Sequence, residues 1–193
     1  MEFLQVCPIH KSKQFILECC DLINSEWPRS KAARLQSLYM SSDKFPTSLV
    51  LILDEQQVVG HVKLSEIKLG GDELMIETMI IHREHRGKGW GKLLMEEAEE
   101  YAQRRGKNKI YLSTRGQEGF YSKLGYEICQ PVMYFGFCDT TPKNDEQAEK
   151  PQQDVITNVC PNAPPPPPLP KKKYKLPKKY RKTAKTYMSK TLK

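Results

Sequence analysis

The sequence has no apolar stretch long enough to cross a lipid bilayer, no secretory leader pattern and no prenylation box. Its six cysteines form no Cys-x-x-Cys pair and no cysteine–histidine spacing of a common metal site. These absences exclude a transmembrane helix and the usual zinc motifs, and they favour a cytosolic protein with free thiols. We therefore expect no metal, no membrane partner and a monomer.

Two widespread phosphate-binding motifs are also missing. A Walker loop requires four residues between a glycine and Gly-Lys-Ser/Thr, and no such string occurs. A dinucleotide fingerprint requires Gly-x-Gly-x-x-Gly after the first strand. The glycines at 87, 89 and 91 have a different spacing and lie in the middle of the chain, so neither kind of nucleotide site is predicted.

Acidic residues are absent from one end of the chain, and this explains its net charge of +8. Residues 171–193 contain ten lysines and one arginine and no acid; without these eleven, 20 of the 31 basic residues remain against 23 acidic ones, a net charge of −3. The rest of the chain therefore has no basic field for specific nucleic-acid binding. Salt-sensitive, sequence-independent binding through the tail stays an alternative.

The most informative feature present is the string Arg-Gly-Lys-Gly-Trp-Gly at 86–91. It follows an apolar strand pattern at 74–81 and precedes a helical pattern at 91–105. Glycines let the backbone approach a ligand closely, and the first turn of a helix offers unpaired N–H groups and a positive dipole end. This combination favours phosphate binding.

The spacing Arg86-x-x-Gly89-x-Gly91 resembles the pyrophosphate loop of the GCN5-related N-acetyltransferases, or GNAT family. A second string, Phe120-Tyr121-Ser122-Lys123-Leu124-Gly125-Tyr126, resembles that family's later signature. The resemblance covers about residues 1–138. It implies an α/β fold with a mixed sheet in the order β-α-α-β-β-β-α-β-α-β-β, and acetyl-coenzyme A as cosubstrate.

Hydrophobic patterns predict the same order of elements. We expect strands at 3–7, 49–53, 58–67, 74–81, 109–114, 126–131 and 133–137. We expect helices at 11–25, from Ser30 onward, at 91–105 and at 117–124. Residues 139–193 are polar, contain the run Pro164–Pro168, and end in the lysine-rich stretch. Such a composition cannot bury a core, so the sequence predicts an acetyltransferase domain at 1–138 and a disordered tail at 139–193 that short peptide substrates do not need.

The family resemblance implies roles for individual residues. The pyrophosphate would lie on the backbone of Arg86, Gly87, Lys88, Gly89, Trp90, Gly91 and Lys92. The pantetheine arm would pair with Met79, Ile80 and Ile81, and Gln117 would contact the arm. Tyr121 would donate a proton to the departing thiolate, although packing beside Phe120 is the simpler role.

The sequence does not identify the general base. Glu77, in a mostly apolar strand, could act through a water, or it could only pair with a neighbouring Lys or Arg. Ser113 occupies the position where some family members have a histidine. His61 fits a packed histidine better than a base.

The connection between the first two helices would form one wall of the acceptor site. It offers Trp27, Arg29, Arg34, Leu35, Gln36 and Ser37, and Arg115 follows the strand at 109–114. Arginine forks match carboxylates, so this wall favours an acidic acceptor over a polyamine. A solvated basic helix face is the simpler interpretation.

The segment 22–30, the two motifs and the proline run together resemble the branch of the family that acetylates the processed, acidic N-terminus of actin. This resemblance implies N-terminal protein acetylation at Asp or Glu, actin as substrate, and profilin as a partner that binds polyproline. The alternatives are acetylation of a small amine and a non-enzymatic polyproline scaffold.

Overall fold

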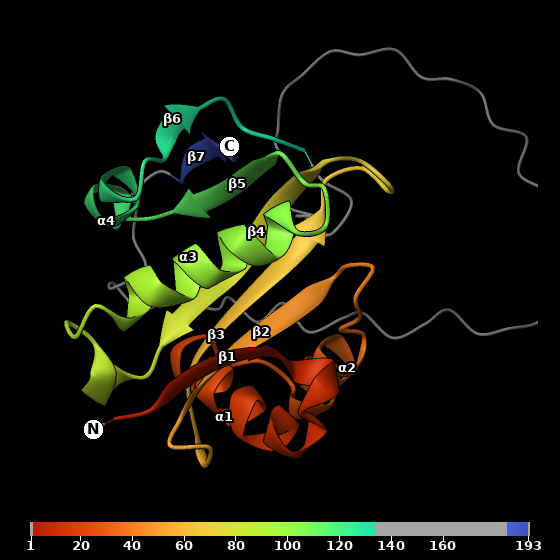
Figure 1. Cartoon of the computed structure of the whole chain (residues 1–193), viewed down its shortest axis with the longest axis vertical. Coiled ribbons are helices and arrows are strands. Elements are labelled where there is room, and N and C mark those ends of the chain that lie inside the picture. Colours follow the sequence, from red (N-terminus) through yellow and green to blue (C-terminus); the bar gives the residue numbers. More distant parts are fainter. Residues whose placement is uncertain (1, 134–184, 193) are drawn as a thin grey trace, which may run out of the picture. The chain divides into compact units, whose positions relative to one another are not determined.

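The structure is a computed structural model, and it describes residues 2–133 and 185–192. Within them, no helix is both long enough and apolar enough to span a membrane. The described residues belong to a single compact unit, built on one seven-stranded mixed sheet (Figure 1).

The strands follow one another in the sheet in the order β1-β2-β3-β4-β5-β7-β6. Their bounds are β1 Leu4–Pro8, β2 Thr47–Leu53, β3 Gln57–Glu66, β4 Glu73–Ile81, β5 Lys109–Thr114, β6 Glu127–Cys129 and β7 Thr186–Thr191. Neighbours are antiparallel except β4 and β5, which run parallel.

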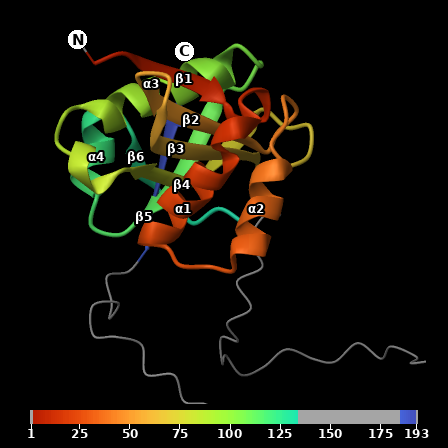
Figure 2. The same ribbon diagram turned by 90° about the horizontal axis from the view of Figure 1, so that it is seen from below.

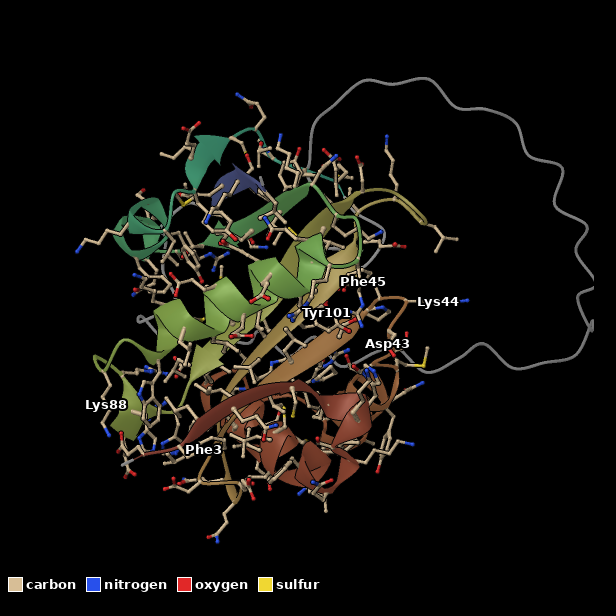
Figure 3. All side chains as sticks on the ribbon, in the orientation of Figure 1. Phe3, Asp43, Lys44, Phe45, Lys88 and Tyr101 are labelled. Atoms are coloured by element: carbon tan, nitrogen blue, oxygen red, sulfur yellow. The ribbon has the colours of Figure 1, made fainter. Side chains whose placement is uncertain are left out.

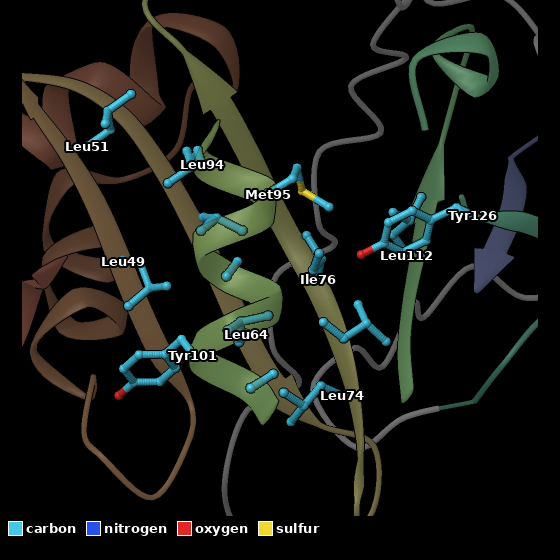
Figure 4. Close-up of a cluster of buried hydrophobic side chains, with 14 of the residues drawn as sticks. Leu49, Leu51, Leu64, Leu74, Ile76, Leu94, Met95, Tyr101, Leu112 and Tyr126 are labelled. Carbon is cyan, nitrogen blue, oxygen red and sulfur yellow. The ribbon is translucent and has the colours of Figure 1, made fainter. Parts of the chain in front are cut away.

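The helices cover both faces of the sheet (Figure 2). They are α1 Ile16–Glu26, α2 Lys31–Tyr39, α3 Trp90–Gln103 and α4 Glu118–Lys123, with 3-10 turns η1 Ile9–Lys11, η2 Lys13–Phe15 and η3 Arg83–His85. Apolar residues of α1 and α2 pack with Val50, Ile52 and Ile80 on one face, and α3 packs on the other. Figure 4 shows Leu94 and Met95 of α3 against the larger of these two cores.

Alternation along β3 separates an apolar face from a polar one. Val62 and Leu64 are fully buried in the core under α3. His61, Lys63 and Ser65 alternate with these two residues, so their side chains point to the opposite face, which α1 and α2 cover. This polar row is the floor on which the candidate site is built.

Strands β4 and β5 pair only at their beginnings. The ladder joins Glu73–Ile76 to Lys109–Leu112 and stops there. From Thr78 onward, β4 pairs with β3 alone among the described strands. The backbone of Met79 to Ile81 thus has an unpaired edge toward β5.

A β-bulge marks the place where β4 leaves β5. Lys63 lies opposite Thr78 and Leu64 opposite Ile76, so Glu77 has no partner residue on β3. A bulge re-aims the local side chains. Here the side chains of both Glu77 and Thr78 contact residues of the polar row on β3.

The fold and the order of elements are as predicted, with one correction at the C-terminus. The predicted tail 139–193 is wrong for Thr186–Thr191, which forms β7 between β5 and β6. Met188 is completely buried, so a short apolar alternation within a lysine-rich stretch suffices to enter the sheet. Residues 139–184, and all but the first residue of the predicted strand 133–137, lie outside the described residues.

Two smaller differences concern the N-terminal region. The predicted helix at 11–25 begins as two 3-10 turns and becomes α-helical only at Ile16. Ser30 is the N-cap residue of α2, as expected, but its side chain makes no capping hydrogen bond.

Candidate functional site

The loop before α3 has the geometry of an anion site. Gly87 and Gly89 have φ of +83° and +85°, which residues with a Cβ rarely adopt. Gly89 is the N-cap of α3, and its carbonyl accepts from the N–H groups of Lys92 and Leu93. The N–H groups of Trp90 and Gly91, which come before these two, have no acceptor within the helix. They and the dipole favour a bound phosphate at this end of α3.

Side chains hold the loop in place. The Arg86 guanidinium donates to the carbonyl of Ile81 over 3.0 Å and to the Glu26 carboxylate over 3.0 Å. The indole of Trp90 is buried and stacks on His85 with ring centroids 4.6 Å apart. Trp90 therefore contributes packing as well as its backbone. The pyrophosphate roles of residues 86–92 remain predictions.

The two ends of α3 have different character, as Figure 3 shows. Lys88, at the loop end, is half-exposed and pairs with Glu2 over 3.2 Å. At the other end, Tyr101 contacts Phe45 edge-to-face and donates to Asp43. The Tyr101 cluster joins the end of α3 to the segment before β2, and we assign it a structural role. The candidate for ligand binding is therefore the loop end of α3.

The unpaired edge of β4 lies next to this loop and to α4. A Cβ at Gly91 would lie 3.2 Å from the Met79 side chain and 3.4 Å from the Phe120 ring. Glycine at this position therefore lets the start of α3 approach both β4 and α4. The predicted pantetheine residues Met79, Ile80 and Ile81 share one open edge, but their contact with the cofactor remains a prediction.

Tyr121 lies in α4 among aromatic rings. Its ring meets Phe120 at 5.0 Å and Tyr126 at 6.0 Å between centroids. Burial raises the pKa of Tyr121 to about 12, so the hydroxyl stays protonated at any physiological pH. This suits a proton donor. Gln117 is exposed at the N-cap of α4, where its carbonyl accepts from the N–H groups of Phe120 and Tyr121.

Glu77 has two partners on β3. Its Oε2 accepts from Lys63 Nζ over 2.7 Å, and its Oε1 accepts from Ser65 Oγ over 2.6 Å. Lys63 Nζ also lies 3.3 Å from Ser37 Oγ of α2. The ion pair matches the simpler interpretation of Glu77, and its role as base remains a prediction.

Ser113 and Tyr187 are neighbours across the β5–β7 ladder. Directly opposed residues share a face of the sheet. Ser113 alternates with the buried Leu112, so both side chains are on the face of α2. Arg115 is exposed just beyond β5. No contact tests the predicted roles of Ser113 and Arg115.

His61 is buried beneath this face, as expected of a packed histidine. Its Nδ1 lies 3.4 Å from Thr78 Oγ1. Burial, with smaller contributions from Lys63 and Arg34, lowers the pKa of His61 to about 3. The imidazole is therefore neutral over the working pH range, in agreement with the packed histidine that the sequence predicts.

The wall formed by α2 presents Arg34 toward the end of α1. Arg34 Nε donates to Asn24 Oδ1 over 3.2 Å, and its Nη2 donates to the Trp27 carbonyl over 2.9 Å. Burial and then the neighbouring Arg29 lower the pKa of Arg34. Within residues 2–133 and 185–192, no ion pair joins Arg29, Arg34 or Arg115 to a carboxylate.

Of the other residues predicted to form the wall of the acceptor site, some have exposed side chains and others are packed against neighbouring residues. Trp27, Arg29 and Gln36 are exposed. Leu35 packs against the core under α1, and Ser37 contacts Lys63. Direct contact of any of them with an acceptor remains a prediction.

Sequence reasoning missed Lys63, Thr78 and Tyr187. Lys63 belongs to an alternation of polar and apolar residues at 60–65, and that pattern is a signal for a polar face above the sheet. Tyr187 lies in β7, within the lysine-rich residues 171–193, and this composition obscured the strand pattern. The pairing of Lys63 with Glu77 joins residues on different strands, and one sequence carries no signal for it.

No metal site is formed by clustered His, Cys, Asp and Glu side chains within the part of the chain that the structure describes.

Residues 15–126 match the acetyltransferase (GNAT) family. The chain is 38% identical over 174 residues to N-alpha-acetyltransferase 80 of Mus musculus, a match that includes 79% of this chain and 55% of that protein. The chain thus spans about half the length of this curated relative.

Solved structures share the fold. A GNAT-family acetyltransferase from Staphylococcus aureus Mu50 superposes with a TM-score of 0.59 at 15% identity, over 99% of this chain and 100% of that one. An acetyltransferase from Streptococcus agalactiae 2603 gives 0.58 at 16% identity, over 98% of each chain.

Proposed function

The chain belongs to the GNAT acetyltransferase family, as the match over residues 15–126 shows, and we propose that it acetylates acidic protein N-termini. The family implies acetyl-coenzyme A as the donor. The acceptor is the α-amine of a chain that begins with Asp or Glu. The likeness to N-alpha-acetyltransferase 80 supports an N-terminal acceptor rather than a small amine.

The coenzyme part of the proposal rests on three adjacent features. The loop at 86–91 offers N–H groups and the dipole of α3 to the pyrophosphate. The open edge of β4 offers backbone groups to the pantetheine amides, which pair as an added strand would. Tyr121 lies beside Phe120, which contacts the start of α3.

One observation carries the choice of acceptor: Arg34 is a sheltered cation without a carboxylate partner in the described residues. Burial disfavours its charge, and Arg29 repels it. A carboxylate brought by the substrate relieves both effects. Arg34 keeps unused N–H donors beyond those given to Asn24 and Trp27, because a guanidinium has five.

The chemistry follows from these placements. The neutral amine attacks the thioester carbonyl, and the tetrahedral intermediate collapses with cleavage of the C–S bond. Tyr121 donates its proton to the departing thiolate, since its raised pKa keeps it protonated until then. Glu77, through a water, takes in turn the two protons that the acceptor ammonium loses, one before the attack and one from the tetrahedral intermediate. One passes to solvent, and the other replaces the proton that Tyr121 gave to the thiolate.

The substrate that fits is processed actin, whose N-terminus is acidic. Profilin fits as a partner for Pro164–Pro168, because aromatic-lined grooves bind polyproline II helices. That proline run lies outside the described residues.

A peptide panel tests the proposal. Peptides that differ only in their first two residues are acetylated with labelled acetyl-coenzyme A, and kcat/KM is compared. A sheltered Arg–carboxylate pair contributes about 1.5–3 kcal/mol and an exposed pair much less, so each acidic residue that forms a sheltered pair should raise kcat/KM by roughly tenfold to a hundredfold. If spermidine or an arylamine were the better acceptor, the small-amine alternative would replace this proposal.

A further inference from the structure

Lys63 and Glu77 form a sheltered ion pair at the floor of the acceptor site. Their Nζ and Oε2 atoms are 2.7 Å apart, and each side chain is 17% exposed. The pair is thus largely out of water but still reachable from the surface. An ion pair in this condition loses hydration, so its contribution to stability is small or negative. Stability alone gives no reason to place it there.

The position of the pair is informative. Glu77 is the first residue of β4 beyond the ladder with β5, in the bulge. It therefore lies where the sheet opens and where, by the proposed function, the thioester is held. Lys63 reaches toward α2, whose Ser37 it contacts. The pair thus connects β4, along which the thioester would be held, to the acceptor wall formed by α2.

The chemistry of the pair is complementary to one kind of residue. An N-terminal Asp or Glu carries an ammonium group and a carboxylate on the same residue. Lys63 and Glu77 present the opposite charges side by side. A chain that begins with a neutral residue offers only the ammonium, and a basic one offers a second cation that Lys63 repels.

We propose that Lys63 and Glu77 recognise the first residue of the acceptor by exchanging their mutual ion pair for two pairs with the substrate. This inference rests on the proposed function. The substrate carboxylate binds Lys63, and the substrate ammonium binds Glu77. The ammonium then gives one proton to solvent through Glu77, and the neutral amine attacks the thioester.

Two serines make the exchange possible at low cost. Ser65 keeps its bond to Oε1 of Glu77 while Oε2 changes partner. Ser37 keeps contact with Lys63 Nζ from the opposite side. The Glu77 carboxylate and the Lys63 ammonium therefore each keep a hydrogen bond while the substrate binds. This matters because a sheltered charge without a hydrogen bond costs free energy.

The proposal divides the recognition of an acidic start between two places. Lys63 reads the first residue at the floor. Arg29 lies just before α2 and Arg34 lies within it, both on the acceptor wall. These two arginines bind the carboxylate of the second residue. Discrimination at the two positions should then respond to different substitutions.

The experiment uses the full chain and four peptides beginning Asp-Asp, Asn-Asp, Asp-Asn and Asn-Asn. Variants are Lys63→Met, Lys63→Arg, Glu77→Gln and the double variant K63M/E77Q. The control is Lys31→Met, because Lys31 is an exposed lysine of α2 that pairs with Asp21 away from this floor. The double variant removes both charges and so avoids an unpaired buried Glu77 that could unfold the protein.

Wild type should prefer Asp over Asn at the first position by roughly tenfold to a hundredfold in kcat/KM. Lys63→Met and the double variant should bring that preference below about twofold and keep the preference at the second position. Lys63→Arg should restore part of it, Glu77→Gln should lower kcat, and Lys31→Met should match wild type. A first-position preference that survives in both Lys63→Met and K63M/E77Q would overturn the inference, whereas a wild type without any acidic preference would overturn the proposed function instead.

Discussion

Lys190 of β7 donates to the carboxylate of Glu99 on α3 over 2.6 Å, and this contact ties the C-terminal strand to the central helix. The Lys190 ammonium also lies 5.6 Å from the centroid of the buried Tyr126 ring. Met188, two residues earlier, has no exposed surface. Strand β7 is therefore part of the domain core, although the intervening residues 134–184 separate it from the other elements in sequence.

A chain that ends at residue 182 should therefore fail to fold or should melt far below the full chain. It loses β7, which pairs with both β5 and β6, and it exposes the core surface that Met188 covers. Replacing residues 139–182 by a Gly/Ser linker of equal length should preserve folding and peptide acetylation. Circular dichroism melting and peptide kinetics check both variants.

The linker variant is also the control, because it removes the proline run and most of the lysines but keeps β7. If the chain ending at 182 retained the melting temperature and peptide kcat/KM of wild type, β7 would be dispensable. This expectation replaces the sequence-based one, in which everything after residue 138 was unnecessary for peptides.

The contrast between α3 and β7 shows what one sequence can predict about this fold. The helix at 90–103 has a regular apolar stripe at Leu94, Ala98 and Ala102 and a glycine-rich start, so its existence is locally encoded. Residues 186–191 enter the sheet because β5 and β6 leave a gap between them. That cause is nonlocal, and the neighbouring lysines conceal the short pattern.

The site divides in the same way. The loop at 86–91 could be predicted because its function depends on consecutive glycines, which a motif records. The Lys63–Glu77 pair depends on the register of β3 and β4 and on a bulge. Register is fixed by packing, so the sequence could offer Glu77 as a candidate but could not name its partner.

Gly89→Glu should reduce coenzyme A binding by at least tenfold, because the new side chain adds bulk and negative charge where the phosphates lie. Gly106→Glu is a matched control, since Gly106 also has positive φ, of +73°, with no atom within 4 Å of a built Cβ, and it follows the far end of α3. Both variants carry similar backbone strain. Calorimetry with coenzyme A separates them, and equal affinities would remove the loop from the coenzyme site.

Tyr121→Phe should lower kcat by roughly 10²–10⁴-fold with little change in the KM for acetyl-coenzyme A, because the lost hydroxyl acts on the leaving thiolate. Tyr39→Phe, at an exposed position of α2, should be neutral. With the pKa of Tyr121 at about 12, its ionisation should produce no alkaline fall in rate below about pH 11. An unchanged kcat in Tyr121→Phe would assign the residue to packing.

Arg29 and Arg34 should separate in mutagenesis. Arg34→Met removes hydrogen bonds to Asn24 and to the Trp27 carbonyl, so it should lower both the preference for acidic peptides and the melting temperature. Arg29→Met should change specificity only, since Arg29 is exposed. Denaturant unfolding combined with the peptide panel measures both properties. Equal destabilisation by the two variants would show that Arg34 has no special structural role.

His61 should make the protein less stable in weak acid. Its pKa is near 6.5 in the unfolded chain and about 3 in the folded one. Between these values the unfolded state binds a proton that the native state does not, so the free energy of unfolding decreases as the pH falls from 6.5 toward 3. The stabilising contribution is fully present above pH 6.5. Each pH unit within the window costs about 1.4 kcal/mol.

His61→Gln isolates this effect, because glutamine can also form a hydrogen bond with Thr78 but does not titrate in this range. Urea unfolding at pH 7 and pH 5 should show that wild type loses about 2 kcal/mol more than the variant on acidification. All other titrating groups contribute equally to both proteins and cancel in the difference. If the two proteins lost the same stability, His61 would have to be protonated in the folded state at pH 5, and its Nε2, which has no partner among the described residues, would then need a hidden acceptor.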